Sequence, residues 1–204
     1  GKTIVKEWAY QLIESEKKSY RSFRSHNSQI GVALSVWKVR PEDAVAVIEA
    51  GISSTGEMEN LAKMIQPDIV VLTHIGDAHD AGFPSRESKI EEKLSLAKEY
   101  AKTLCLPAHI DEVKSFLNSP KANTIVKGKA LCFWDAKNTE PTGLSQEIIQ
   151  VISSRFNTLA MQSNAMAAAL TALCCGIPQK SVEVSLGNVK PIPLRLEVLH
   201  GDSQ

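Results

Sequence analysis

The sequence predicts an α/β fold in which a mainly parallel sheet is flanked by helices. Two continuous apolar runs, Ala44–Ile48 and Ile69–Leu72, are typical of strands buried on both faces of a parallel sheet. Stretches with the 3.6-residue apolar period of helices separate these runs from each other and from later strand-like segments. This alternation of helices and buried strands favours the α/β class over an all-α or all-β fold.

The first half of the chain begins with a predicted helix at Thr3–Glu14. A candidate strand at Tyr20–Phe23 follows, then a turn-rich segment at Ser25–Gly31 and an apolar, helical stretch at Val32–Val39 that ends before a proline. The face that we expect the first helix to bury comprises Val5, Trp8, Ala9 and Leu12.

The clearest strand, Asp43–Glu49, follows this region. A capping-box spacing opens the next predicted helix, Ser54–Ile65. The second buried strand ends in the polar segment Thr73–His79, and a helix is expected at Arg86–Lys102.

The second half continues the alternation and ends at a linker-like stretch, residues 191–193. Gly176 and Pro178 supply a helix stop signal. The predicted strands are Thr103–Leu106, Lys129–Trp134 and Ile148–Ile152, and the predicted helices are Ile110–Leu117, Ser163–Cys175 and Pro178–Leu186.

Composition indicates an ordinary globular domain. The 204 residues suffice for one sizeable core, and 43% of them are hydrophobic. Lys+Arg and Asp+Glu both number 23, so bulk charge does not indicate a nucleic acid or a membrane surface as a partner. No apolar run approaches the ~20 residues needed to cross a bilayer. We therefore expect a cytoplasmic protein without membrane insertion.

The sequence contains four cysteines and no C-x-x-C pair. We interpret all four as reduced core residues of a cytoplasmic protein, in preference to a disulfide or metal role. They are Cys105, Cys132, Cys174 and Cys175.

Gly1, Lys2 and Thr3 form the last half of the P-loop motif G-x-x-x-x-G-K-[ST] and open the first helix. The backbone amides and the dipole of a helix N-terminus favour a bound anion there. We expect Lys2 to reach the β- and γ-phosphates of a nucleotide and the Thr3 hydroxyl to ligate Mg²⁺. Taken alone, this tripeptide also fits ordinary terminal residues.

Two further candidates lie where predicted strands end. Ligands of an open parallel sheet bind beyond the carboxyl ends of its strands, and Glu49 and His79 both fall there. Alone, Glu49 also fits a strand end that faces water, and His79 fits a hydrogen-bonded loop histidine. Their joint occurrence downstream of Gly-Lys-Thr favours a Mg²⁺–nucleotide site.

Lys93 shares the apolar stripe of its predicted helix with Ile90 and Leu94. One interpretation is a packed stem with the ammonium in water. The other is a lysine that CO₂ carbamylates, which would make it an oxygen ligand for a second Mg²⁺. Periodicity leaves both open.

An ordered set of short motifs connects these candidates. It comprises Gly1–Thr3, Asn27–Leu34, Val47–Gly51, Gly56–Met58, Leu72–His79 and Glu92-Lys93. Together they resemble the central ATP-binding domain of the Mur ligases, in particular the D-alanyl-D-alanine-adding type and its version fused to an alanine racemase. The resemblance covers residues 1–191 and implies a missing first strand and first half of the P-loop. Residues 192–204 would begin a truncated C-terminal domain.

The resemblance implies roles for particular residues, with ATP and Mg²⁺ as cofactors. Gly1, Lys2 and Thr3 would hold the ATP phosphates, Asn164 would contact adenine, and Arg195 would approach the nucleotide. The implied metal ligands are Thr3, Glu49, His79 and Lys93, the implied catalytic residues are Lys2, Lys93 and His79, and the implied substrate contacts are Ser25 and Asn27. The sequence departs from the family pattern at His74 and in the segment Ala160–Ala165, which affects the adenine pocket more than the phosphate site.

The activity implied by the resemblance is ATP-driven amide-bond formation through an acyl phosphate. UDP-MurNAc-tripeptide and D-Ala-D-Ala would be the substrates, and the ligase part would be a monomer. Two alternatives stay open: a relative of folylpolyglutamate synthase or cyanophycin synthetase with the same central domain, and a nucleotide-binding module without ligase activity. We expect the chain by itself to be inactive and part of a longer protein.

Overall fold

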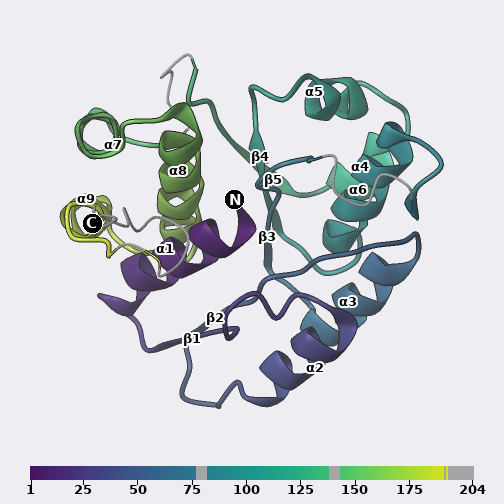
Figure 1. Cartoon of the computed structure of the whole chain (residues 1–204), viewed down its shortest axis with the longest axis horizontal. Coiled ribbons are helices and arrows are strands. Elements are labelled where there is room, and N and C mark those ends of the chain that lie inside the picture. The colour runs from purple at the N-terminus through teal and green to yellow at the C-terminus, as the bar shows by residue number, and fades with distance from the viewer. Residues whose placement is uncertain (77–81, 138–142, 191, 193–204) are drawn as a thin grey trace, which may run out of the picture.

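A computed structural model describes residues 1–76, 82–137, 143–190 and 192 of the chain. Within these ranges, helices surround two small parallel sheets (Figure 1). The predicted α/β class with parallel strands is confirmed. None of the helices within these ranges has the length and apolar character that crossing a bilayer requires.

All the described strand pairs are parallel. In the first sheet, β1 (Ser19–Arg21) pairs with β2 (Val45–Val47). In the second sheet the order is β3-β4-β5, with β3 at Ile69–Val71, β4 at Thr103–Pro107 and β5 at Ala130–Trp134. The strands therefore form where the apolar runs predicted them, although β1 and β2 are short.

A cavity of about 830 Å³ separates the two sheets, and both β2 and β3 contribute to its lining. Val45 and Val47 are half-buried and Ala46 is exposed, so the prediction of a β2 strand buried on both faces is wrong. The reason is the cavity, because Val45, Ala46 and Val47 all line it, although the two valines also pack against the main hydrophobic cluster.

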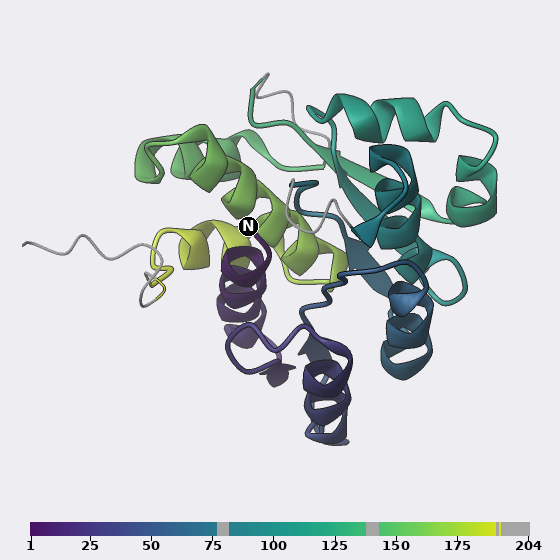
Figure 2. The same ribbon diagram turned by 45° about the vertical axis from the view of Figure 1, so that its right-hand side comes forward.

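One face of the larger sheet packs against a layer built around α1 (Lys2–Glu14) and α8 (Leu159–Cys174). These two helices cross in close contact, as Figures 1 and 2 both show. Helices α7 (Gln146–Arg155) and α9 (Gln179–Leu186) complete this layer. The predicted apolar face of α1 is confirmed, because all four of its expected residues are buried.

The opposite face of the larger sheet packs against α4 (Arg86–Leu94), α5 (Asp111–Leu117) and α6 (Ala122–Val126). Beside the smaller sheet, α2 (Gln29–Trp37) packs on α3 (Glu57–Ile65). This arrangement leaves the start of α1 and the ends of β2 and β3 around one cavity.

The predicted strand at Ile148–Ile152 is wrong, because this segment lies inside helix α7. The Ser145 side chain caps the helix by accepting a hydrogen bond from the Ile148 amide at 3.4 Å. Ile148, Ile149 and Ile152 are buried together, which is the period of a helix face.

Several helix ends also differ from the prediction. Helix α4 ends at Leu94 and a 3-10 turn follows at Ser95–Ala97, because the Ser95 hydroxyl donates to the Glu92 carbonyl at 2.7 Å. Helix α8 begins at Leu159 and not at Ser163, because Thr158 caps it and accepts from the Met161 amide at 3.2 Å.

Helix α3 begins at Glu57, three residues after the predicted start. Gly56, with a φ of 88°, precedes it, and Glu57 accepts hydrogen bonds from the Ser53 and Ser54 amides. This is half of the predicted capping box, displaced to the loop before the helix. Helix α6 was not predicted.

Candidate functional site

The N-terminus of α1 faces the cavity. Gly1 is the N-cap residue and makes no side-chain capping bond, and the first turn of the helix carries no acidic residue. Lys2 is exposed and lines the cavity, while Thr3 is buried. The structure thus places this helix end and Lys2 at the cavity wall, and phosphate binding there stays a prediction.

Gly1 brings this helix end against two other parts of the fold. A Cβ atom placed on Gly1 would lie 3.7 Å from Asn164 Oδ1 in α8 and 3.7 Å from Thr73 Oγ1, just beyond β3. The start of α1, the end of β3 and the first half of α8 therefore meet at one point.

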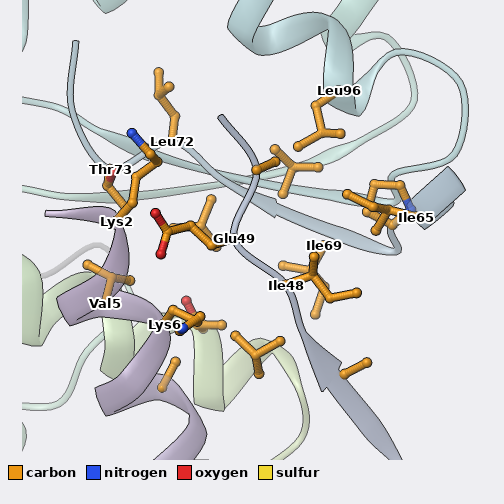
Figure 3. Close-up of a pocket in the computed structure, with 18 of the residues that line it drawn as sticks. Lys2, Val5, Lys6, Ile48, Glu49, Ile65, Ile69, Leu72, Thr73 and Leu96 are labelled. Atoms are coloured by element: carbon orange, nitrogen blue, oxygen red, sulfur yellow. The ribbon is translucent and has the colours of Figure 1, made fainter. Parts of the chain in front are cut away.

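Glu49 follows β2 and its carboxylate points into the same cavity (Figure 3). It is only 5% exposed. Oε1 accepts a hydrogen bond from Asn27 Nδ2 at 2.9 Å, and the backbone amide of Glu49 donates to Ser22 Oγ at 3.1 Å. Oε2 is buried and has no hydrogen-bond partner among the described residues.

A buried carboxylate oxygen without a partner is costly unless a cation or a donor binds to it. Figure 3 shows Glu49 on the same side of the cavity as Lys2 and Thr73. Hard oxygen donors at the end of a phosphate-binding helix suit Mg²⁺. The Glu49 carboxylate therefore fits the metal that the sequence indicates, whereas Thr3 is not among the residues that line the cavity and its role as a ligand stays a prediction.

Lysines from α4 approach the cavity from the opposite side. Lys93 is half-buried and lines the cavity. This position differs from that of a lysine whose ammonium group lies in bulk solvent. Lys89 is 1% exposed and donates to the Gly76 carbonyl at 2.5 Å. Two positive charges of α4 thus lie around the space that Lys2 and Glu49 enclose.

Comparison with known families identifies this arrangement. The Mur ligase middle domain family matches residues 1–172. The chain belongs to the Mur ligase family.

Individual relatives agree with this assignment. The UDP-N-acetylmuramoyl-tripeptide–D-alanyl-D-alanine ligase of Bacillus subtilis is 25% identical over 213 residues, which cover 100% of this chain and 46% of the relative. The Escherichia coli enzyme of the same name is also 25% identical and covers 96% of this chain and 46% of the relative. The Borreliella burgdorferi enzyme is 37% identical over 93 residues, which are 46% of this chain and 20% of the relative.

Solved structures show the same fold. A crystal structure of MurF from Acinetobacter baumannii superimposes with a TM-score of 0.79 at 20% identity, over 97% of this chain and 46% of that chain. This Mur ligase chain thus spans about half the length of the curated relatives that it matches.

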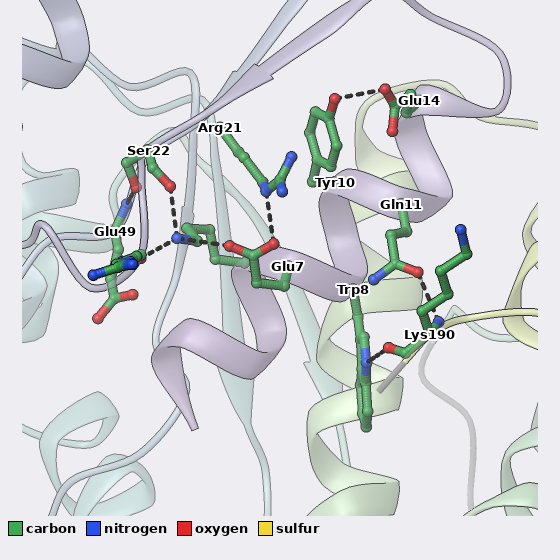
Figure 4. A network of polar contacts seen from close by, with 11 residues as sticks. Glu7, Trp8, Tyr10, Gln11, Glu14, Arg21, Ser22, Glu49 and Lys190 are labelled. Carbon is green, nitrogen blue, oxygen red and sulfur yellow. Dashed lines mark hydrogen bonds and ion pairs between the residues drawn. The ribbon is translucent and has the colours of Figure 1, made fainter. Parts of the chain in front are cut away.

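A buried lysine that sequence reasoning missed organises the loop beside the site in this Mur ligase domain. Lys6 is 3% exposed and donates to the carbonyls of Ser22, at 2.7 Å, and Arg24. It also pairs with Glu7 at 3.0 Å, and Glu7 accepts from Arg21 at 2.6 Å (Figure 4). The sequence carries no clear signal for this role, because the partners of Lys6 are backbone carbonyls of a loop.

Asn27 and Ser25 were predicted to face the substrate. Asn27 uses its side-chain amide to hold Glu49, and a Cβ on Gly51 would lie 2.9 Å from Asn27 Cγ. The glycine is therefore needed for this close approach. Ser25 is exposed. The two residues lie on the loop that Lys6 anchors, and their contact with substrate stays a prediction.

Of the remaining residues named in the sequence analysis, two lie within the described ranges and two lie outside them. Asn164 lies beside Gly1, but in the second turn of α8 and not at the helix start, because α8 begins earlier than predicted. His74 is exposed and lines the cavity. His79 and Arg195 lie outside the described residues.

Proposed function

We propose that this chain is the ATP-binding middle domain of a ligase that adds D-Ala-D-Ala to UDP-MurNAc-tripeptide. The observation that carries the proposal is the similarity to ligases of that name in B. subtilis and E. coli, which extends over 100% and 96% of the chain. The geometry supports the nucleotide part independently, because the start of α1, the Lys2 side chain and a buried Glu49 oxygen without a partner among the described residues line one cavity.

The residues of α1 would hold the phosphates of ATP. Lys2 and the first-turn amides would offset the charge of the transferring phosphoryl group. Thr3 and Glu49 would hold Mg²⁺, which when bound supplies positive charge next to the phosphates. Asn164 lies close enough to Gly1 to contact the nucleotide as well.

The proposed reaction has two steps, phosphorylation of a carboxylate and displacement of the phosphate by an amine. A carboxylate oxygen of the tripeptide attacks the γ-phosphorus and ADP leaves, which gives an acyl phosphate. The amine of D-Ala-D-Ala then attacks the acyl carbon, phosphate leaves, and the amine loses a proton. Lys2 would stay with the phosphoryl group throughout, because it projects from a helix end that does not need to move.

Lys93, in carbamylated form, and His79 are proposed ligands of a second Mg²⁺. The position of Lys93 on the cavity wall supports this role. We also keep Arg195 as a nucleotide contact and Ser25 and Asn27 as contacts of the UDP-linked substrate.

The proposed domain organisation places the middle domain at residues 1–191 and the start of a C-terminal domain at residues 192–204. The open edges of β2 and β3 support one further parallel strand, which would lie between them and lead to Gly1. We propose a monomeric ligase that acts in the cytoplasm on precursors of peptidoglycan.

Phosphate release from ATP by the full-length protein tests this function. We expect release to require UDP-MurNAc-tripeptide and D-Ala-D-Ala together. Folate with glutamate, and an amino-acid polymer with its monomer, serve as competing substrate pairs. Release that depends on one of these pairs and not on the muramoyl substrate would contradict the proposal.

A further inference from the structure

Three cysteine sulfurs meet in the core on the side of the larger sheet that faces α8. Cys174 Sγ lies 3.9 Å from Cys105 Sγ and 3.9 Å from Cys132 Sγ. All three sulfurs lie within 4.8 Å of one another. Cys105 is buried, and Cys132 and Cys174 are half-buried.

The fold explains why residues so distant in the sequence meet. Cys105 of β4 and Cys132 of β5 are direct partners in the parallel register, so both side chains point to the same face of the sheet. The residues next to Cys105, Leu104 and Leu106, point to the other face and join the core under α4. Cys174 is the last residue of α8, which packs on β4 and β5 and places its sulfur over the pair.

This triangle matches the geometry of a metal bound by three sulfurs. With metal–sulfur bonds of about 2.3 Å, the sulfurs of a planar three-coordinate ion lie about 4.0 Å apart. Thiolate sulfur is a soft ligand that selects soft ions over Mg²⁺. We infer that Cys105, Cys132 and Cys174 form a binding site for one soft, thiophilic metal ion.

The surroundings favour a three-coordinate ion. Within the described ranges, the group of potential ligands contains these three cysteines and no histidine or carboxylate. Structural zinc and iron–sulfur centres use four protein ligands, so this site is better suited to a soft ion that accepts three sulfur ligands, for which Cd(II) serves as the probe. The C-terminal carbonyls of α8 add partial negative charge beside Cys174, which favours a cation there.

The protonation of the cluster gives the site a pH dependence. A metal ion binds cysteine as the thiolate, so the thiols of Cys105, Cys132 and Cys174 must lose their protons when the ion binds. The hydrogen bond to Cys174 and burial raise the pKa of Cys105, and burial raises that of Cys132. Metal binding must release these protons to solvent, so affinity should fall as the pH falls.

Cys175 provides a matched control. It follows Cys174 directly but does not belong to the sulfur triangle. Burial raises its pKa to about 11, so it stays a neutral thiol. The substitution Cys175→Ser replaces a thiol by a hydroxyl, as Cys174→Ser does, but it leaves the three sulfurs of the triangle in place.

The test is a titration of the reduced full-length protein with Cd(II) in the presence of excess Mg²⁺. We expect one equivalent of Cd(II) to produce a thiolate-to-metal ultraviolet absorption band and to raise the melting temperature. Loss of a hydrogen-bond partner of a metal ligand lowers the affinity of a metal site roughly 10- to 100-fold. Cys174→Ser removes a ligand itself, so it should lower the affinity for Cd(II) by more than this. Cys175→Ser should bind as the wild type does.

Cys132→Ala is a second variant, which we expect to lose the band in the same way if Cys174→Ser fails to fold. No band with the wild-type protein would overturn the inference. Equal loss of Cd(II) binding in Cys174→Ser and Cys175→Ser would also overturn it. The same holds if the three cysteines form a disulfide and the protein does not bind Cd(II) after reduction. The assay uses no nucleotide or peptide substrate, so its outcome is independent of the proposed ligase activity.

Discussion

At the scale of single residues, the two oxygens of Glu49 have different environments. Oε1 accepts from Asn27, whereas Oε2 is buried without a partner among the described residues. One oxygen thus fixes the orientation of the carboxylate and the other stays available to a cation. This division is why we assign Asn27 to the positioning of Glu49 in addition to its proposed substrate contact.

Asn27→Ala should destabilise the folded protein by about 1–3 kcal/mol, because Glu49 Oε1 loses its donor in a buried position. Urea unfolding of the variant and the wild type measures this difference. Ser25→Ala, on the same loop but exposed, should unfold as the wild type does. An unchanged midpoint for Asn27→Ala would show that the side-chain bond to Glu49 does not form.

Lys2 and Lys6 lie one turn apart on α1 and should respond oppositely to the same substitution. Lys6→Met removes the donor of the Ser22 and Arg24 carbonyls and the partner of Glu7, so we expect a loss of about 3 kcal/mol or more in the free energy of unfolding. Lys2→Met should unfold normally, because Lys2 is exposed, and should lose ATP-dependent turnover. Urea unfolding and phosphate release together measure both effects. Equal destabilisation by the two substitutions would contradict these assignments.

At the scale of elements, α7 shows where a short apolar pattern is ambiguous. Ser145→Ala should cost about 1 kcal/mol, because the first turn of the helix loses its cap. Ser145→Asp should retain most of the stability, because aspartate caps helices equally well. Chemical unfolding followed by circular dichroism measures both variants. A strand at this position would make the two substitutions indistinguishable.

The elements that could be predicted are those with an unambiguous period. The first helix and strands β3, β4 and β5 form close to the predicted positions, because the helix has a clear 3.6-residue stripe and the strands are short apolar segments that alternate with predicted helices. Ile148–Ile152 could not be assigned in the same way, since four apolar residues interrupted by Gln150 fit either a strand or one face of a helix. Helix α6 is a five-residue helix, too short for a clear period.

The residues of the candidate site also differ in how well the sequence predicts their positions. The places of Lys2 and Glu49 on the cavity wall could be predicted because a helix start and a strand end fix their position relative to the sheet, whereas their roles, and that of Thr3, stay predictions. Lys6 could not, because its partners are backbone carbonyls whose position the loop sets. The meeting of the three cysteines could not be predicted either, because it depends on the register of β4 with β5 and on the packing of α8 against these strands.

At the scale of the whole molecule, the division into two sheets is the main departure from the predicted single sheet. Strands β2 and β3 each have a parallel partner on one side and the cavity on the other. An edge strand of a sheet is suited to pair with a further strand along its unpaired side. The proposed additional strand would join the two sheets into one and would place Gly1 at its carboxyl end.

Hydrogen exchange tests this completion of the sheet. In the full-length protein we expect the amides of β2 and β3 to be protected as strongly as those of β4. In the 1–204 chain expressed alone, the same two strands should exchange faster while β4 stays protected, because β4 is paired on both sides. Identical exchange of β2 and β3 in both proteins would argue against an additional strand.

The proposed function requires the cavity at the start of α1 for the addition of D-Ala-D-Ala to UDP-MurNAc-tripeptide. Mass spectrometry of the product made by the full-length protein with ATP, UDP-MurNAc-tripeptide and D-Ala-D-Ala tests it most directly. We predict UDP-MurNAc-pentapeptide from the wild type and none from Lys2→Ala, although this variant should unfold as the wild type does. Equal amounts of pentapeptide from both proteins, or none from a folded wild type, would contradict the account.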